Sequence, residues 1–221
     1  MRLFILVAAA LLSLPAAAQL APVPPAIAGR AWLLVDHTSG QPLAGQNADE
    51  RVEPASLTKL MTAYLVFAAL KQGALKPDMQ VAVSERAWKA QGSRMFIEPK
   101  KPVTVDELVR GMIVQSGNDA CIALAEAVAG SEEAFVQAMN REAARLGLRG
   151  TRYANATGLP DPQHYTTAAD LARLTSALIH DFPEFYPIYS MKEYRYNNLS
   201  QPNRNRLLWL DPAVDGVKTG H

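Results

Sequence analysis

Cysteine is almost missing from this sequence of 221 residues, and its scarcity excludes several kinds of protein. The single cysteine, Cys121, cannot form an internal disulfide, and the chain holds neither a CxxC pair nor a Cys/His spacing of the kind that binds zinc. Four histidines are scattered along the chain, at positions 37, 164, 180 and 221. The sequence therefore predicts no metal site.

An excess of charge of one sign is missing too. There are 22 lysines and arginines against 21 aspartates and glutamates, a net charge of +1. No basic face for nucleic acid and no acidic tail is implied, so nucleic acid is not an expected partner. With 49% hydrophobic and 19% charged residues, the composition is that of a globular chain, long enough for one domain or two small ones.

The apolar run near the N-terminus, LFILVAAALLSL, is too short for a membrane anchor. It has about a dozen residues, where roughly 20 are needed to cross a bilayer. Arg2 precedes it and the small residues AAAQ follow, which is the layout of a secretory signal peptide cleaved after Ala18. We therefore expect residues 1–18 to be a signal peptide and residues 19–29 a proline-rich leader. The mature protein is expected in the periplasm or on the outer face of the cytoplasmic membrane.

The hydrophobic pattern predicts a strand, then a helical block, then further strands. The first strand covers residues 30–36 and is followed by a turn and a return. Helices are expected over residues 56–72, 104–114, 118–130, 131–147 and 166–180, and strands over residues 191–200 and 213–220. This order indicates an α/β or α+β protein whose sheet is completed by the C-terminal part of the chain.

Three short motifs occur in a fixed order along this framework. They are S-x-x-K at Ser56 and Lys59, S-x-N at Ser116 and Asn118, and K-T-G at Lys218, Thr219 and Gly220. Alone, S-x-x-K is expected by chance about once in a chain of this length, and Ser56 could be only a helix cap. All three motifs in this order occur by chance only at about the per-cent level.

The residue types of the first motif suit nucleophilic catalysis. At a helix N-terminus, Ser56 would expose its hydroxyl and keep its backbone N–H free to stabilise an oxyanion. One helical turn places Lys59 on the same face. An ordinary lysine is protonated at neutral pH, but burial and a second cation, Lys218, would lower the pKa of Lys59. The neutral amine could then take the proton of Ser56.

The three motifs together are the signature of penicillin-recognising serine enzymes. From about residue 31 to residue 221 the chain resembles the low-molecular-mass penicillin-binding proteins, the serine-type D-alanyl-D-alanine carboxypeptidases. The segments PASLTKLMT, GSRMF, NATGL, QPNRNRLLW and VDGVKTGH carry this resemblance. It implies a β-lactamase/transpeptidase-like fold over residues 30–221, with a five-stranded antiparallel sheet packed against a helical domain.

The resemblance also implies that something is missing after His221. In the family, the K-T-G strand continues into further strands and a closing helix, and many members add a β-rich domain and an amphipathic membrane anchor. We therefore expect the catalytic domain to be truncated at its C-terminus and the C-terminal part of its sheet to be missing. Membrane association would require a C-terminal anchor that this sequence does not contain.

Roles for the motif residues follow from the same resemblance. Ser56 would form the acyl-enzyme, Lys59 would act as its base, and Ser116 would relay a proton to the leaving amine. Asn118 would hydrogen-bond both the lysine and a substrate amide. The remaining substrate-binding residues would be Lys218, Thr219, Gly220 and His221, the last of which would supply the second oxyanion N–H. No cofactor is needed for this chemistry.

The sequence thus predicts a D,D-carboxypeptidase that removes the terminal D-alanine from peptidoglycan stem peptides, with β-lactams as covalent inhibitors. A D,D-endopeptidase, a class A β-lactamase and a non-catalytic peptidoglycan-binding protein are the alternatives. A β-lactamase would need a glutamate in an E-x-x-x-N segment soon after S-x-N, and the segment here begins only at Glu193. Asn155 and His164 are given structural roles, and Arg94 is left open between a site-lining and a solvated position.

Overall fold

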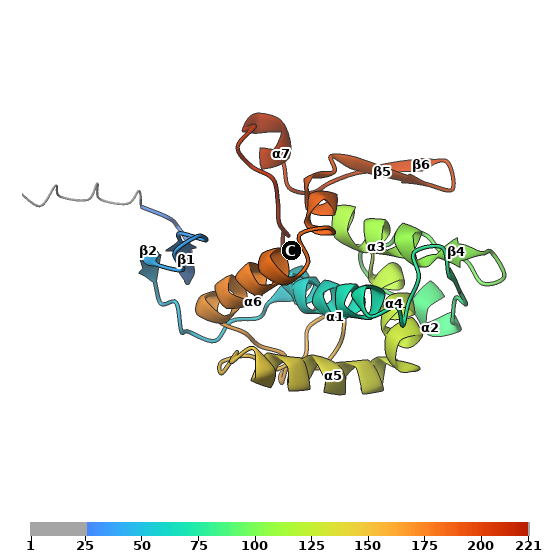
Figure 1. Cartoon of the computed structure of the whole chain (residues 1–221), viewed down its shortest axis with the longest axis horizontal. Coiled ribbons are helices and arrows are strands. Elements are labelled where there is room, and N and C mark those ends of the chain that lie inside the picture. Colours follow the sequence, from blue (N-terminus) through green and yellow to red (C-terminus); the bar gives the residue numbers. More distant parts are fainter. Residues whose placement is uncertain (1–25, 221) are drawn as a thin grey trace, which may run out of the picture.

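One apolar helix runs through the middle of a helical body in the computed structural model, which describes residues 26–220 (Figure 1). This central helix, α1 (Lys59–Lys71), is buried along most of its length. A helix that is apolar all round belongs in the interior. It contacts four other helices, which are α3 (Val105–Val114), α4 (Asn118–Ala129), α5 (Glu132–Arg145) and α6 (Ala168–Asp181). The predicted signal peptide and His221 lie outside the described residues.

The strands form three separate two-stranded antiparallel sheets among the described residues, rather than one five-stranded sheet. The pairs are β1 (Trp32–Val35) with β2 (Pro42–Gln46), β3 (Gln80–Val81) with β4 (Val103–Thr104), and β5 (Glu193–Tyr196) with β6 (Leu199–Pro202). Hairpin β1–β2 contacts α6 at one end of the molecule, and hairpin β5–β6 lies against α3 (Figure 1). The expected mixture of helices with antiparallel strands is confirmed.

Helix boundaries follow the capping chemistry of the sequence. At the start of α3, Thr104 and Glu107 form a capping box, in which each side chain accepts from the backbone N–H of the other residue. Helix α4 ends at Gly130, whose φ of +81° is the left-handed conformation that glycine adopts without strain. Short elements complete the chain, namely the 3₁₀ turns η1 (Ala55–Thr58) and η2 (Tyr186–Ser190) and the helices α2 (Glu85–Trp88) and α7 (Leu207–Leu210).

Two of the predicted strands are wrong. Residues 191–200 do not form one strand but most of a hairpin, because Asn197 and Asn198 both have positive φ and make the tight turn between β5 and β6. Residues 213–220 form no strand, since a strand requires a hydrogen-bonded neighbour and none of the described residues pairs with this segment. Side chains hold it instead, for example Asn205, whose Nδ2 donates to the carbonyl of Gly216 at 2.8 Å.

The core lies between α1 and the helices around it. Most of its largest fully buried apolar side chains come from α1, α3, α4, α5 and α6, and Met95 and Ile97 add to them from the loop before β4. The helical ones include Met61, Phe67, Leu108, Met112, Leu124, Met139 and Leu174. No helix within residues 26–220 is both long and apolar enough to cross a membrane. This packing fixes the N-terminal end of α1 between α4 and the loop that follows α5.

Candidate active site

The nucleophile candidate Ser56 lies in the 3₁₀ turn η1, immediately before α1. The residue before it, Ala55, has a φ of +46°, a conformation that residues with a side chain seldom adopt. This sharp entry leaves Ser56 partly exposed while the following residues become buried. Lys59 Nζ lies 3.2 Å from Ser56 Oγ, so the structure brings these two predicted residues into direct contact.

The amine of Lys59 is held inside the protein rather than in solvent. The residue is 2% exposed, and its Nζ donates to the carbonyl oxygen of Thr157 at 2.6 Å. The pKa of Lys59 is lowered to about 8, mainly by burial and to a smaller extent by the nearby guanidinium of Arg204. At pH 7 roughly a tenth of the amine is therefore neutral, and the neutral fraction rises to about half near pH 8. Because Thr157 takes one N–H, the lone pair of the neutral amine is available to the hydroxyl of Ser56.

The loop that presents Thr157 is built by Asn155. Its Oδ1 accepts from the backbone N–H groups of Thr157, Gly158 and Leu159 and from the Thr157 hydroxyl, at 2.7–3.2 Å. This is the structural role expected of an Asx turn. The sequence did not predict that the carbonyl of Thr157 would bind Lys59. Every residue has a main-chain carbonyl, so the residue type does not show which one accepts a hydrogen bond.

The S-x-N motif lies between α3 and α4. Ser116 has a φ of +70° and is almost fully buried, and Asn118 is the first residue of α4. Asn118 Nδ2 donates to Gln91 O at 2.7 Å. The hydroxyl of Ser116 and the side-chain oxygen of Asn118 have no hydrogen-bond partner among residues 26–220. The expected hydrogen bond from Asn118 to Lys59 is not present among these residues; the lysine amine contacts Ser56 Oγ and the carbonyl oxygen of Thr157.

Asp119, which the sequence did not single out, secures the loop beside this motif. It is buried, and its two carboxylate oxygens accept from the backbone N–H groups of Met95, Phe96 and Ile97 at 2.8–3.2 Å. A buried carboxylate that collects several backbone donors is well stabilised. The GSRMF loop is thereby fixed against the start of α4.

The K-T-G segment lies beside the nucleophile turn. A Cβ atom placed on Gly220 would be 3.7 Å from the carbonyl oxygen of Pro54, ordinary van der Waals contact. The pKa of Lys218 is lowered to about 7, mainly by burial and in addition by the charges of Lys59 and Arg204. The sequence predicted one further cation near Lys59, namely Lys218. The structure has two, Lys218 and Arg204, and nothing in the sequence indicated Arg204. Thr219 is partly buried, and its carbonyl oxygen accepts from Lys218 Nζ at 3.0 Å, whereas His221 lies outside the described residues.

A pocket of about 190 Å³ opens in front of Ser56. Its lining includes Ser56, Asn118, Thr157, Gly158, His164 and Arg204. Lys59 does not line the pocket itself but contacts Ser56, which does. Three other predicted site residues, Ser116, Lys218 and Thr219, do not line it either. Within residues 26–220 no three histidine, cysteine, aspartate or glutamate side chains are grouped to hold a metal ion.

His164 forms hydrogen bonds to both sides of this pocket. Its Nδ1 accepts from the backbone N–H of Ala154 at 3.2 Å, so Nδ1 is unprotonated, and Nε2–H donates to Thr58 Oγ1 at 2.8 Å. Burial lowers the pKa of His164 to about 4, which keeps the ring neutral. The neutral ring therefore links the turn that carries Ser56 to the loop that carries Thr157.

We expect this bridge to make folding stability depend on pH. The folded-state pKa of His164 lies below its ordinary value of 6.5, so its contribution is complete above pH 6.5 and is lost as the pH falls through about 4. The loss is at most about 3 kcal/mol of unfolding free energy. Urea unfolding at pH 7 and pH 4 measures it, and His164→Gln, which cannot titrate, should remove that part of the slope. An unchanged slope would contradict the assignment.

Comparison with known proteins decides the family. A family described as D-alanyl-D-alanine carboxypeptidase, peptidase S11, matches residues 18–221. The chain belongs to this family. The D-alanyl-D-alanine carboxypeptidase DacC of Escherichia coli (strain K12) is 50% identical over 203 residues, covering 89% of this chain and 51% of that protein.

Solved structures of penicillin-binding proteins share the fold. Penicillin-binding protein 5 from Haemophilus influenzae superposes with a TM-score of 0.88 at 44% identity, over 90% of this chain and 59% of that one. Penicillin-binding protein D2 from Listeria monocytogenes, in its ampicillin-bound form, gives a TM-score of 0.79 at 28% identity, over 90% and 81% of the two chains. The expected transpeptidase-like fold of this D-alanyl-D-alanine carboxypeptidase family member is confirmed. The chain spans about half the length of the curated relatives it matches.

Proposed function

We propose that this chain carries the catalytic centre of a serine-type D-alanyl-D-alanine carboxypeptidase that acts on peptidoglycan stem peptides and is acylated by β-lactams. The observation that carries the proposal is the contact between Lys59 Nζ and Ser56 Oγ, at 3.2 Å, with a lysine whose pKa is lowered to about 8. A nucleophile beside a neutral base suits acyl transfer. Membership of the family supports the substrate class.

Acylation would begin with transfer of the Ser56 hydroxyl proton to the neutral amine of Lys59. Ser56 Oγ then bonds to the carbonyl carbon of the penultimate D-alanine, and the backbone N–H of Ser56 stabilises the oxyanion. When the C–N bond breaks, the leaving D-alanine takes a proton, for which Ser116 is the proposed relay. Water then hydrolyses the ester and restores the Ser56 hydroxyl.

Substrate recognition is assigned to the polar groups that surround the scissile bond. The free side-chain oxygen of Asn118 can accept from a substrate amide, and Lys218 with Thr219 would bind the terminal carboxylate. Gly220 leaves room for a peptide to lie along the segment. His221 is proposed to supply the second oxyanion donor.

The same proposal includes export. The signal-peptide pattern over residues 1–18 and the family's work on cell-wall peptides both favour a mature protein in the periplasm or on the outer face of the cytoplasmic membrane. Residues 19–29 are the proposed leader and residues 30–221 the proposed catalytic domain. Sequencing the N-terminus of the exported protein should find Gln19.

Labelled penicillin provides the test. We expect intact-mass analysis to show one adduct, peptide mapping to place it on Ser56, and Ser56→Ala to remove it. The purified protein should also release D-alanine from diacetyl-Lys-D-Ala-D-Ala. An adduct on another serine, or an undiminished adduct in Ser56→Ala, would refute the nucleophile.

Cross-linked muropeptides separate the alternatives. Cleavage of these, without release of D-alanine from the linear peptide, would favour an endopeptidase. The β-lactamase alternative is disfavoured because Glu193 lies on β5, where its carboxylate accepts from Ser200 Oγ at 3.2 Å, and does not line the Ser56 pocket.

A further inference from the structure

A second pocket adjoins the one in front of Ser56. We call it the arginine pocket; it has a volume of about 590 Å³, and its polar lining is Arg94, Gln115, Gln201, Asn203, Arg204 and Arg206. It shares Gly92, Ser93 and Arg204 with the Ser56 pocket. A ligand long enough to leave the Ser56 pocket on this side would therefore enter the arginine pocket directly.

The arginine pocket is positively charged. Three guanidinium groups line it, from Arg94, Arg204 and Arg206, and its lining includes no aspartate or glutamate. Within residues 26–220 the arginines that form a close ion pair lie outside this pocket, as Arg86 and Arg145 do. Among residues 26–220 no carboxylate lies within 4.0 Å of the three guanidiniums, and Arg94 only faces the ring of Phe96, at 5.1 Å. Their planar donors suit a carboxylate.

A buried amide without partners points to the same ligand. Gln115, the residue before Ser116, is 4% exposed, and neither its Nε2 nor its Oε1 has a hydrogen-bond partner among the described residues. Its neighbour in the lining, Asn203, is by contrast fully engaged with backbone groups. A buried amide left unpaired is costly, and a substrate peptide could pair with both atoms, because its carboxylate can accept from Nε2 and a peptide N–H can donate to Oε1.

The walls of the pocket are held in place before any ligand arrives. Gln201, on β6, donates from Nε2 to the carbonyl oxygen of Arg94 at 3.2 Å, which joins the β5–β6 hairpin to the GSRMF loop. Asp119 fixes the same loop from the other side. A preformed site of this kind loses little entropy when it binds.

We propose that the arginine pocket is a subsite for a carboxylate on the substrate peptide, upstream of D-Ala-D-Ala. This inference rests on the proposed function, because it takes the scissile bond to lie at Ser56. The terminal carboxylate is already assigned to Lys218 and Thr219, so the carboxylate that this pocket would bind is placed in the acyl-donor part of the peptide. The subsite thus selects acidic stem peptides over neutral ones.

A matched pair of peptides tests the subsite. Acetylated peptides that end in D-Ala-D-Ala would carry glutamate or glutamine at the third position from the C-terminus, and a second pair would carry them at the fourth. We expect kcat/KM to favour the glutamate peptide of at least one pair by about tenfold, the usual worth of one charge-assisted hydrogen bond at a partly exposed site. The preference should shrink as salt is raised.

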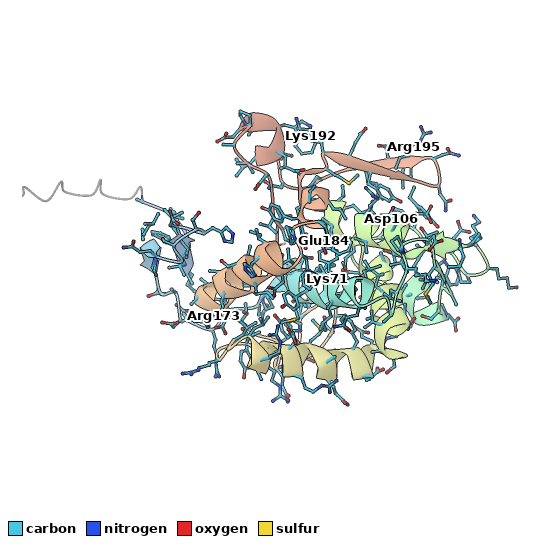
Figure 2. All side chains as sticks on the ribbon, in the orientation of Figure 1. Lys71, Asp106, Arg173, Glu184, Lys192 and Arg195 are labelled. Carbon is cyan, nitrogen blue, oxygen red and sulfur yellow. The ribbon has the colours of Figure 1, made fainter. Side chains whose placement is uncertain are left out.

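Variants of the arginine pocket then test whether its arginines cause the preference for glutamate peptides. Arg94→Gln and Arg206→Gln should each lower the glutamate-to-glutamine ratio of kcat/KM several-fold. Arg195→Gln is the matched control, because it removes the same charge from the β5–β6 hairpin but lies outside the pocket (Figure 2). It should leave the ratio unchanged.

The outcomes separate the subsite from the enzyme activity itself. Turnover of the glutamine peptides with no preference for glutamate in either pair would overturn the subsite and leave the proposed function standing. No turnover of any of the peptides would refute the proposed function. An equal fall of the ratio in Arg195→Gln would show long-range charge attraction in place of a built site.

Discussion

Replacing Lys59 by methionine should abolish acylation of the protein by penicillin. Methionine fills a similar buried volume but has no basic amine, so the Ser56 hydroxyl, 3.2 Å from Lys59 Nζ in the parent, would lose its proton acceptor. Loss of general-base catalysis costs roughly 10²–10⁴ in rate. Lys59→Arg should fail as well, since arginine keeps the positive charge but stays protonated. Stopped-flow acylation with a reporter β-lactam measures the effect.

The pH profile of the parent supplies an independent check. Because the neutral amine is the active form, the acylation rate should rise with pH through about 8, the pKa to which burial lowers Lys59. Lys71→Met is the matched control, at the other end of the same helix, where Lys71 lies at the surface near Glu184 (Figure 2). Acylation of Lys59→Met within a few-fold of the parent would show that another group is the base.

Local signals in the sequence were enough to predict the helices and the first motif. Two examples are the capping box at Thr104 and Glu107 and the glycine at position 130. Both are short-range features, so the helix start or end that they determine does not depend on the rest of the fold. The S-x-x-K spacing likewise places Lys59 one turn beyond Ser56 wherever the segment lies. Features that a single turn of chain determines are therefore readable without tertiary information.

Most of the features that were predicted wrongly, or not predicted, depend on residues far away in the chain. Residues 213–220 have strand-like composition, yet a strand exists only when a neighbour pairs with it, and none of the described residues does so. The cation Arg204 and the carbonyl of Thr157 reach Lys59 only through the fold. The hairpin over residues 193–202 was missed for a local reason, because Asn197 and Asn198 are a turn signal that was taken as part of a strand.

Gly158 should be the least replaceable glycine of the candidate site. Its φ is +90°, and a Cβ atom added there would lie 1.8 Å from the carbonyl oxygen of Ala55, far inside any tolerable contact. The oxygen belongs to the backbone of Ala55 and cannot rotate away as a flexible side chain would, so relief requires the Thr157 loop to move away from the turn that carries Ser56. We expect Gly158→Ala to lower the unfolding free energy by about 3 kcal/mol or more, as overpacking adds to backbone strain.

The same movement should slow acylation more than stability alone explains. Thr157 precedes Gly158 and holds Lys59 Nζ through its carbonyl at 2.6 Å, so a shift of the loop releases the amine from its place beside Ser56. Misplacement of a catalytic group by about 1 Å can cost 10²-fold in rate, and we expect a loss of that order in the fraction that remains folded.

The Gly73→Ala variant distinguishes the cost of backbone strain from the cost of the steric clash expected in Gly158→Ala. Gly73 also has a positive φ, +74°, but apart from its two chain neighbours no heavy atom of the described residues lies within 4 Å of where its Cβ would be. Its substitution should therefore cost only the backbone strain, about 1 kcal/mol, and leave acylation intact. Urea unfolding and acylation rates of the two variants, measured side by side, make the comparison. Equal losses in both variants would mean that the approach of Gly158 to Ala55 does not organise the site, whereas a loss of acylation confined to Gly158→Ala would show that this contact positions Lys59 through Thr157.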